Sequence, residues 1–122
     1  MKRNLQILIL MVVLNIVFGC LFAINAQKVG GFTKISKTDE VALEAADFAV
    51  EAKSKKDETT FTLVSLEKAE RQVVAGTNYR LCLSIKDADE NEMTVLVVVY
   101  RNLQKVFSLT SWKEAECGDD ES

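Results

Sequence analysis

The sequence predicts an α+β domain in which one helix packs against a four- to five-stranded antiparallel sheet. Three observations lead to this fold class. Apolar residues recur at helical spacing in the region from 38 to 55. Runs rich in β-forming residues follow, and short polar or glycine-containing stretches separate them. The chain has 122 residues, which is enough for one small domain.

The first 26 residues differ from the rest and have the order of a secretory signal peptide. Lys2 and Arg3 precede an apolar stretch from Leu5 to Phe22, and Ala26 offers a small residue at a cleavage point. We therefore expect a secreted protein whose mature domain spans residues 27–122.

Two other interpretations of this segment stay open. The apolar stretch is long enough for an uncleaved membrane anchor, which needs about 20 residues. A bacterial lipobox at residues 17–20 is the second, although Phe18 fits that pattern poorly. At the other end of the chain, acidic residues predict a disordered tail from about residue 117.

The helix is expected over residues 38–55. Ser36 or Thr38 can cap it, and acidic residues in the first turn suit the helix dipole. Lysines near residue 55 suit its other end. The predicted apolar face comprises Val41, Ala45, Phe48, Ala49 and Ala52.

The strands are expected after Asp57. They are predicted at residues 60–66, 77–86, 93–100 and 106–112. The second run has the clearest pattern, since its apolar residues alternate with more polar ones at a period of two. One face of such a sheet is covered by the helix and the other is left to solvent. The apolar set is Tyr79, Leu81, Leu83 and Ile85.

Three cysteines occur, and Cys20 would leave with the signal peptide. Cys82 and Cys117 remain in a chain directed to an oxidising compartment, where one disulfide can form. Two separate thiols, Cys82 in a strand and Cys117 in a loose tail, are an equally good interpretation.

Composition argues against several classes of function. The net charge of −3 gives no reason to expect nucleic acid or an anionic membrane as a partner. Histidine is absent, which removes the usual general base and the commonest metal ligand, so we expect no enzyme and no cofactor. Residues 87–91 resemble the start of a calcium loop, but Glu92 and Val98 stand where that loop requires Gly and Glu. No metal site is therefore expected.

Residues 72–76 form the motif on which the functional hypothesis depends. A hairpin tip at this point projects Val73 and Val74 away from the sheet, where only a partner can bury them. Gly76 permits the positive φ that a tight turn often needs. The sequence of the motif is Gln72, Val73, Val74, Ala75 and Gly76.

This motif matches the Gln-x-Val-x-Gly signature of cystatins, and the surrounding sequence extends the match. Gly30-Gly31 lies where cystatins carry an N-terminal glycine. Further segments resemble plant cystatins in the same order along the chain: Phe48-Ala49-Val50, Thr77-Asn78-Tyr79-Arg80-Leu81 and Leu109-Thr110-Ser111-Trp112. The chain from residue 27 onward thus resembles a plant-type cystatin.

The resemblance implies a reversible inhibitor of papain-like cysteine proteases. In that family an N-terminal trunk, here Gly30 and Gly31, and two hairpin loops form a wedge that blocks the active-site cleft without a covalent bond. It also implies a monomer whose partner is the protease. The alternative is a secreted binding module that keeps the scaffold and has lost inhibition.

The second loop departs from the family pattern. Cystatins usually carry Pro-Trp there, and this chain has no proline. Since 25 residues separate Gly76 from Asn102, the aligned pair is Asn102-Leu103, and Trp112 is expected to be a packing residue of the last strand. Leucine offers a smaller apolar anchor than tryptophan. Asn102 lacks the fixed φ of proline, so we expect a less preorganised loop.

Overall fold

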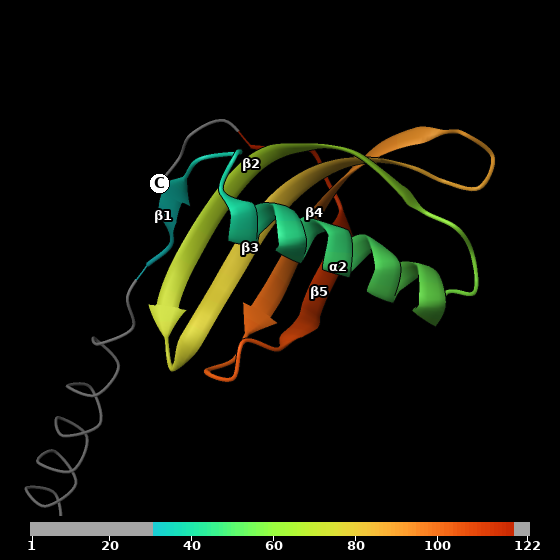
Figure 1. The fold of residues 1–122 in the computed structure, drawn as a ribbon. Coiled ribbons are helices and arrows are strands. Elements are labelled where there is room, and N and C mark those ends of the chain that lie inside the picture. Colours follow the sequence, from blue (N-terminus) through green and yellow to red (C-terminus); the bar gives the residue numbers. More distant parts are fainter. Residues whose placement is uncertain (1–30, 119–122) are drawn as a thin grey trace, which may run out of the picture.

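The computed structural model describes residues 31–118, which form one helix and five strands (Figure 1). The strands form one antiparallel sheet in the order β1-β2-β3-β4-β5. The elements are β1 (Thr33–Ile35), α2 (Glu40–Lys56), β2 (Thr62–Val74), β3 (Gly76–Lys86), β4 (Glu92–Arg101) and β5 (Phe107–Glu114). The predicted fold class is confirmed. The expected signal peptide, Gly30 and the end of the acidic tail lie outside the described residues.

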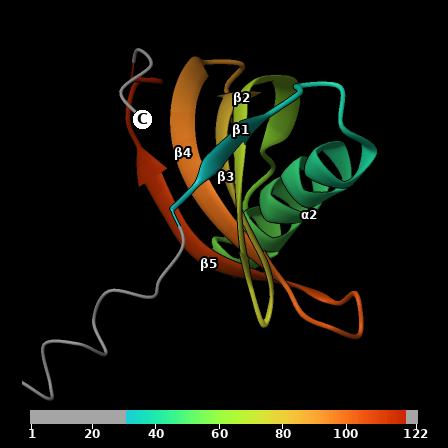
Figure 2. The same cartoon turned by 90° about the vertical axis from the view of Figure 1, so that its left-hand side faces the viewer.

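The helix lies across one face of the sheet, and the sheet curves around it (Figures 1 and 2). Its buried side chains are mostly alanines, so the helix axis approaches the strands closely. Val41, Phe48 and Ala52 of the predicted apolar face lie at the rim of this contact and are only partly buried. The core comprises Ala42, Ala45, Ala46, Ala49 and Val50 of the helix, and Leu66, Ala69, Tyr79, Leu81, Leu83, Ile85, Val95, Val97 and Val99 of the sheet. Among the described residues, no helix has the length and apolar character needed to cross a bilayer.

The helix cap differs from the expectation. Asp39 is the N-cap, and its Oδ2 accepts a hydrogen bond from the Ala42 backbone N–H at 2.9 Å. Ser36 and Thr38 do not cap α2; their hydroxyl oxygens lie 2.7 Å apart and hydrogen-bond to each other. Asp39 takes this role because it lies immediately before the first helical residue and its acceptor reaches the orphan N–H groups.

Strand β2 is much longer than predicted. It continues past Leu66 to Val74, and from Ala69 onward each residue pairs with one of β3. Its second half is rich in charged and polar residues, which obscures the strand pattern in the sequence. Glu70 is buried there because it pairs with Arg80 on the neighbouring strand. Cross-strand pairing thus determines this half of β2 more than local propensity does.

Strand β1 was not predicted. It has three residues and pairs with β2, with Thr33 opposite Arg71 and Ile35 opposite Ala69. Ile35 packs against the core. This pairing directs residues 31 and 32 toward the end of the sheet where β2 turns into β3, which Figure 1 also shows.

Aromatic packing closes the edge of the core near β5. Trp112 packs on Phe61 with a ring-centroid separation of 5.6 Å, and Phe48 packs on Phe107 at 5.5 Å. Trp112 is therefore a packing residue of the last strand, as expected, and not part of the second loop.

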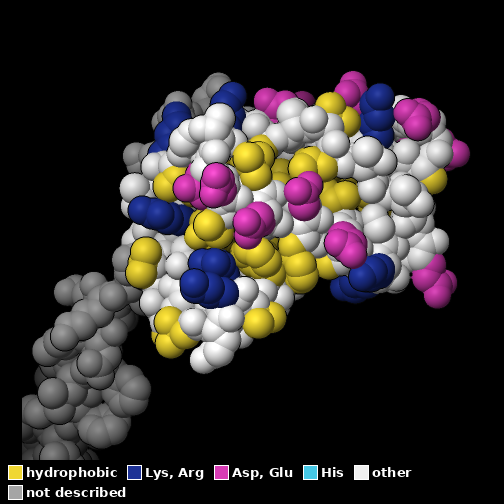
Figure 3. Space-filling model, viewed as in Figure 1, with side chains coloured by type: hydrophobic (Ala, Val, Ile, Leu, Met, Phe, Trp, Pro, Cys, Tyr) yellow, Lys and Arg dark blue, Asp and Glu magenta, His cyan; other side chains and the backbone are white. Residues whose placement is uncertain are grey.

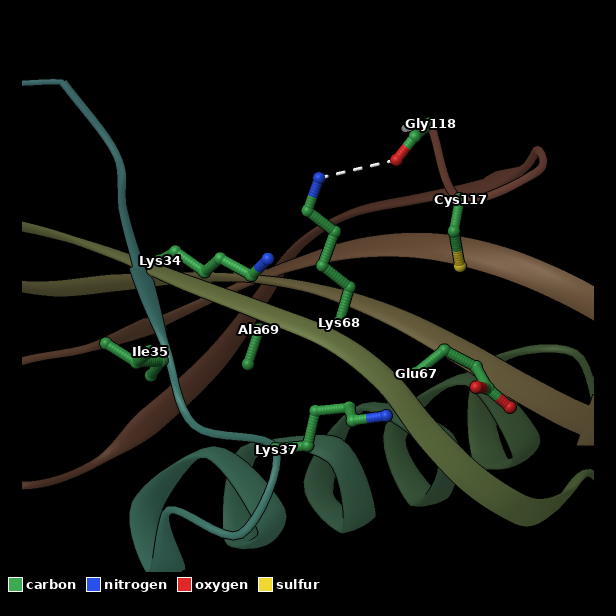
Figure 4. A pocket seen from close by; sticks show the side chains of 8 residues that line it. All are labelled: Lys34, Ile35, Lys37, Glu67, Lys68, Ala69, Cys117 and Gly118. Carbon is green, nitrogen blue, oxygen red and sulfur yellow. Dashed lines mark hydrogen bonds between the residues drawn. The ribbon is translucent and has the colours of Figure 1, made fainter. Parts of the chain in front are cut away.

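A disulfide joins Cys82 in the middle of β3 to Cys117, with the two Cα atoms 5.7 Å apart. Figure 4 shows Lys68 of β2 reaching toward the same segment, where its Nζ donates to the Gly118 carbonyl at 3.3 Å. These contacts attach the segment after β5 to the face of the sheet opposite α2. The start of the expected acidic tail is thus covalently linked to the sheet.

Loss of this disulfide should lower the free energy of unfolding. The Cys82→Ala, Cys117→Ala double variant frees a loop of 35 residues in the unfolded chain, which by chain entropy is worth about 3–4 kcal/mol. Urea denaturation of the oxidised parent and the variant measures the difference. The reduced parent is the control and should unfold close to the variant. Equal midpoints for oxidised parent and variant would contradict the expectation.

Candidate functional site

The turn between β2 and β3 is the tightest in the described chain. Val74 pairs directly with Gly76, which leaves Ala75 as the single residue at the tip. Gly76 has φ +99°, a conformation that residues with a Cβ rarely adopt. A Cβ built on Gly76 would lie 2.5 Å from the Arg101 carbonyl oxygen and 2.7 Å from the Tyr100 hydroxyl. Both the backbone conformation and the available space therefore require glycine.

Two hydrogen bonds hold this first tip in place. The Tyr100 hydroxyl of β4 donates to the Ala75 carbonyl at the apex. At the base of the tip, the Asn78 side-chain amide donates to Gln72 Oε1 at 3.0 Å. The signature residue Gln72 thus stabilises the hairpin, and the apex is linked to the strand that leads into the second loop.

The second tip, residues 102–106, is ordered by Asn102. Its Oδ1 accepts from the backbone N–H groups of Gln104 at 3.0 Å and Val106 at 2.9 Å. Its own N–H donates to the Val106 carbonyl, and its carbonyl accepts from Lys105, both at 2.9 Å. Four hydrogen bonds of Asn102 thus order the loop, although it lacks a proline. A side-chain acceptor fixes this turn in place of a proline ring.

Both tips expose apolar side chains at the same end of the sheet. Val73 is 70 % exposed, Val74 42 % and Leu103 72 %. The two tips line a shared groove of about 300 Å³, together with Thr77, Arg101 and Lys105. The structure thus brings together predicted site residues that lie about 30 positions apart in the sequence. Exposed valine and leucine side chains around one groove form a surface that a partner can bury.

The N-terminal segment is attached beside the first tip. The Phe32 ring lies under the Arg80 guanidinium, with 4.1 Å between ring centroid and Cζ. Arg80 in turn donates to both carboxylate oxygens of Glu70, at 3.1 and 2.7 Å, and this hydrogen bonding raises the pKa of the Arg80 guanidinium. Gly31 precedes this anchor and has no neighbour within 4 Å of a built Cβ. Gly31 therefore remains accessible, while Gly30 lies outside the described residues.

Sequence reasoning missed Tyr100 and Arg101 as parts of this site. Tyr100 ends a valine-rich run and has the ordinary pattern of a strand residue. Its hydrogen bond to Ala75 joins residues 25 positions apart, which no local pattern reveals.

Other features of the surface lie apart from the tips. A concavity of about 300 Å³ lies between β1, β2 and the C-terminal segment, and Lys34, Lys37 and Lys68 are on its wall (Figure 4). It contains none of the predicted binding residues except Cys117 of the disulfide.

The Asp87 turn has a structural role. Oδ1 of Asp87 accepts from the backbone N–H groups of Asn91 and Asp89, at 2.9 Å each, and these bonds, led by that from Asn91, lower the pKa of the carboxyl group. Among residues 31–118, no cluster of three or more His, Cys, Asp and Glu side chains is arranged to hold a metal ion.

Comparison with known proteins identifies relatives of this chain. A family model described as an aspartic acid proteinase inhibitor (SQAPI) matches residues 35–115. The chain is 34 % identical to cysteine proteinase inhibitor 5 of Arabidopsis thaliana, over 92 % of this chain and 93 % of that protein.

Two proteins of the soft tick Ornithodoros moubata extend the comparison. Cystatin-2 of this tick is 30 % identical to this chain, over 69 % of this chain and 80 % of its own length. This chain belongs to the cystatin family. The crystal structure of a salivary cystatin from the same tick superposes with a TM-score of 0.62 at 28 % identity, covering 71 % of this chain and 98 % of that one. The helix-on-sheet architecture is therefore shared with a solved cystatin.

A side chain at position 76 should destabilise this cystatin. Gly76→Ala introduces a Cβ at positive φ and 2.5 Å from a backbone oxygen, so we expect a loss of about 1–3 kcal/mol in the free energy of unfolding. Amide chemical shifts should change at both tips, because the clash involves Arg101 as well as the turn. Gly31→Ala is the matched control and should change neither quantity, since the space around it is open. Equal stability of the two variants would show that the close approach at Gly76 is not maintained in solution.

Proposed function

We propose that this cystatin is a secreted, plant-type inhibitor that blocks the active-site cleft of papain-like cysteine proteases. The observation that carries the proposal is the exposure of Val73, Val74 and Leu103 around one groove, on two turns that are each held by hydrogen bonds. The name of the Arabidopsis relative supports the protease class.

The proposed inhibition is steric and reversible. Val73 and Leu103 supply apolar surface that is buried on binding, and each buried apolar side chain contributes about 1.5–3 kcal/mol before the costs of association. Because both turns are preorganised by hydrogen bonds, little conformational entropy is lost when they dock. Gly30 and Gly31 extend the contact along the cleft as a trunk with no side chains. The protein acts as a monomer and needs no cofactor.

Secretion is the second part of the proposal. Residues 1–26 act as the signal peptide and are removed, which leaves Cys82 and Cys117 in an oxidising compartment. The disulfide between them supports this location, since such bridges are rare in reducing compartments.

A second candidate target is a pepsin-like aspartic protease. The family model that matches residues 35–115 is described as an aspartic acid proteinase inhibitor. In addition, Asn102-Leu103 replaces the Pro-Trp pair expected of an inhibitor of papain-like enzymes. A scaffold that binds a protein without inhibiting any protease is the remaining alternative. Activity measurements separate these three functions.

Titration of papain and pepsin with the mature chain tests the target class. We expect residual papain activity to fall with inhibitor concentration, competitively with substrate and reversibly on dilution, while pepsin activity is unchanged. Val73→Asp should raise the inhibition constant for papain about a hundredfold or more, because docking would bury an unpaired carboxylate. Val64→Asp is the matched control, since Val64 is also exposed and lies on β2 away from the tips. Inhibition of pepsin alone, or of neither enzyme at a large molar excess, would contradict the proposal.

The two residues of the second tip should respond in opposite directions. Leu103→Trp enlarges the exposed apolar anchor and should tighten papain inhibition about tenfold, equivalent to about 1–2 kcal/mol. Asn102→Pro should weaken inhibition by a similar factor, because it removes a backbone donor and the Oδ1 acceptor of two further hydrogen bonds. Inhibition constants of the two single variants are compared with that of the parent. Tighter inhibition by the proline variant would mean that the side-chain bonds of Asn102 do not order the loop.

A further inference from the structure

The charge around the two tips has one sign only. No Asp or Glu occurs in residues 71–86 or 93–113, which include both tips and most of the strands that carry them, although the whole chain has a net charge of −3. The cations nearest to the tips along the sequence are Arg71, Arg101 and Lys105. In Figure 3, acidic side chains lie over the helix and the far end of the molecule, whereas the end that carries the tips displays hydrophobic and basic side chains.

The three cations are distributed around the apolar tips. Arg71 lies on β2, four residues before Ala75 at the first tip, and pairs with Thr33 of β1 on one side and with Tyr79 of β3 on the other. Arg101 lies between the tips, where its guanidinium is 5.8 Å from the Phe107 ring centroid. Lys105 projects from the second turn itself, at φ +66°.

No carboxylate among the described residues neutralises these three cations. The ion pairs of that part of the chain lie elsewhere: Lys53–Asp57, Lys55–Glu51, Arg80–Glu70 and Lys86–Glu90.

We propose that Arg71, Arg101 and Lys105 form a basic rim that docks against carboxylates bordering the active-site cleft of the target protease. This inference rests on the proposed function and adds the chemistry of the partner surface: the favoured targets are papain-like proteases with an acidic cleft border. Apolar tips at the centre with charges around them match the usual division of an interface into an apolar core and a polar rim. The rim accelerates encounter and selects among proteases, while the apolar tips supply most of the affinity.

The experiment measures association and dissociation rate constants with papain by stopped flow, at ionic strengths from about 0.02 to about 0.5 M, over which the screening length shortens several-fold. For the parent chain, the association rate constant should fall about tenfold or more over this range. For the Arg71→Gln, Lys105→Gln variant, it should be about five- to tenfold lower at low salt and depend little on salt. The dissociation rate constants should agree within about twofold, because rim charges act mainly on encounter.

The matched control is Lys55→Gln with Lys56→Gln. It changes the net charge by the same amount, but at the far end of α2 (Figure 1). It should associate like the parent. In a papain-like protease whose cleft border carries carboxylates, their replacement by amides should slow association of the parent and leave the Arg71→Gln, Lys105→Gln variant unaffected.

The outcomes distinguish a failure of the basic-rim proposal from a failure of the proposed inhibitor function. Normal papain inhibition with an association rate that is independent of salt, or with equal rates for the two double variants, overturns the rim and leaves the inhibitor function intact. Absence of inhibition by the parent chain overturns both.

Discussion

The close approach of the first turn to the end of β4 constrains the whole functional end of the molecule. It is possible only because Gly76 has no side chain, which lets Ala75 and Tyr100 hydrogen-bond across the gap. Since β4 leads directly into the second turn, this one contact determines how far apart the two tips lie. The groove between them and the exposure of Val73 and Leu103 follow from that spacing.

The residues that stabilise the fold and those proposed to bind a partner lie in different parts of the sheet. The helix and the central strands bury an apolar core of alanine, valine and leucine, which provides most of the stability. The tips leave their apolar side chains in water and use hydrogen bonds to keep their shape. This arrangement costs free energy in the unbound protein and lowers the entropy lost on docking. In the second turn, the side chain of Asn102 provides these hydrogen bonds.

The fold class could be predicted from the sequence because periodicity alone separates a single helix from the strands after it. Prediction failed where a partner strand decides the structure. The polar half of β2 becomes a strand because β3 pairs with it, and β1 exists only through its pairing with β2. The signature residues of the first tip were found from their match to the cystatin signature. The role of Tyr100 was not, since its partner is distant in the sequence, and the side-chain hydrogen bonds that Asn102 makes within its turn were not predicted either.

The disulfide also affects how well the folded chain resists digestion by exopeptidases. Exopeptidases attack chain ends that fray, and the C-terminal end of this chain follows β5, an edge strand with a neighbour on one side only. Cys117 lies three residues beyond β5 and is covalently joined to β3 in the middle of the sheet. A carboxypeptidase that removes the residues after Gly118 therefore meets a cross-linked residue before it reaches the strand. The bridge thus protects the β-sheet from being shortened past Cys117.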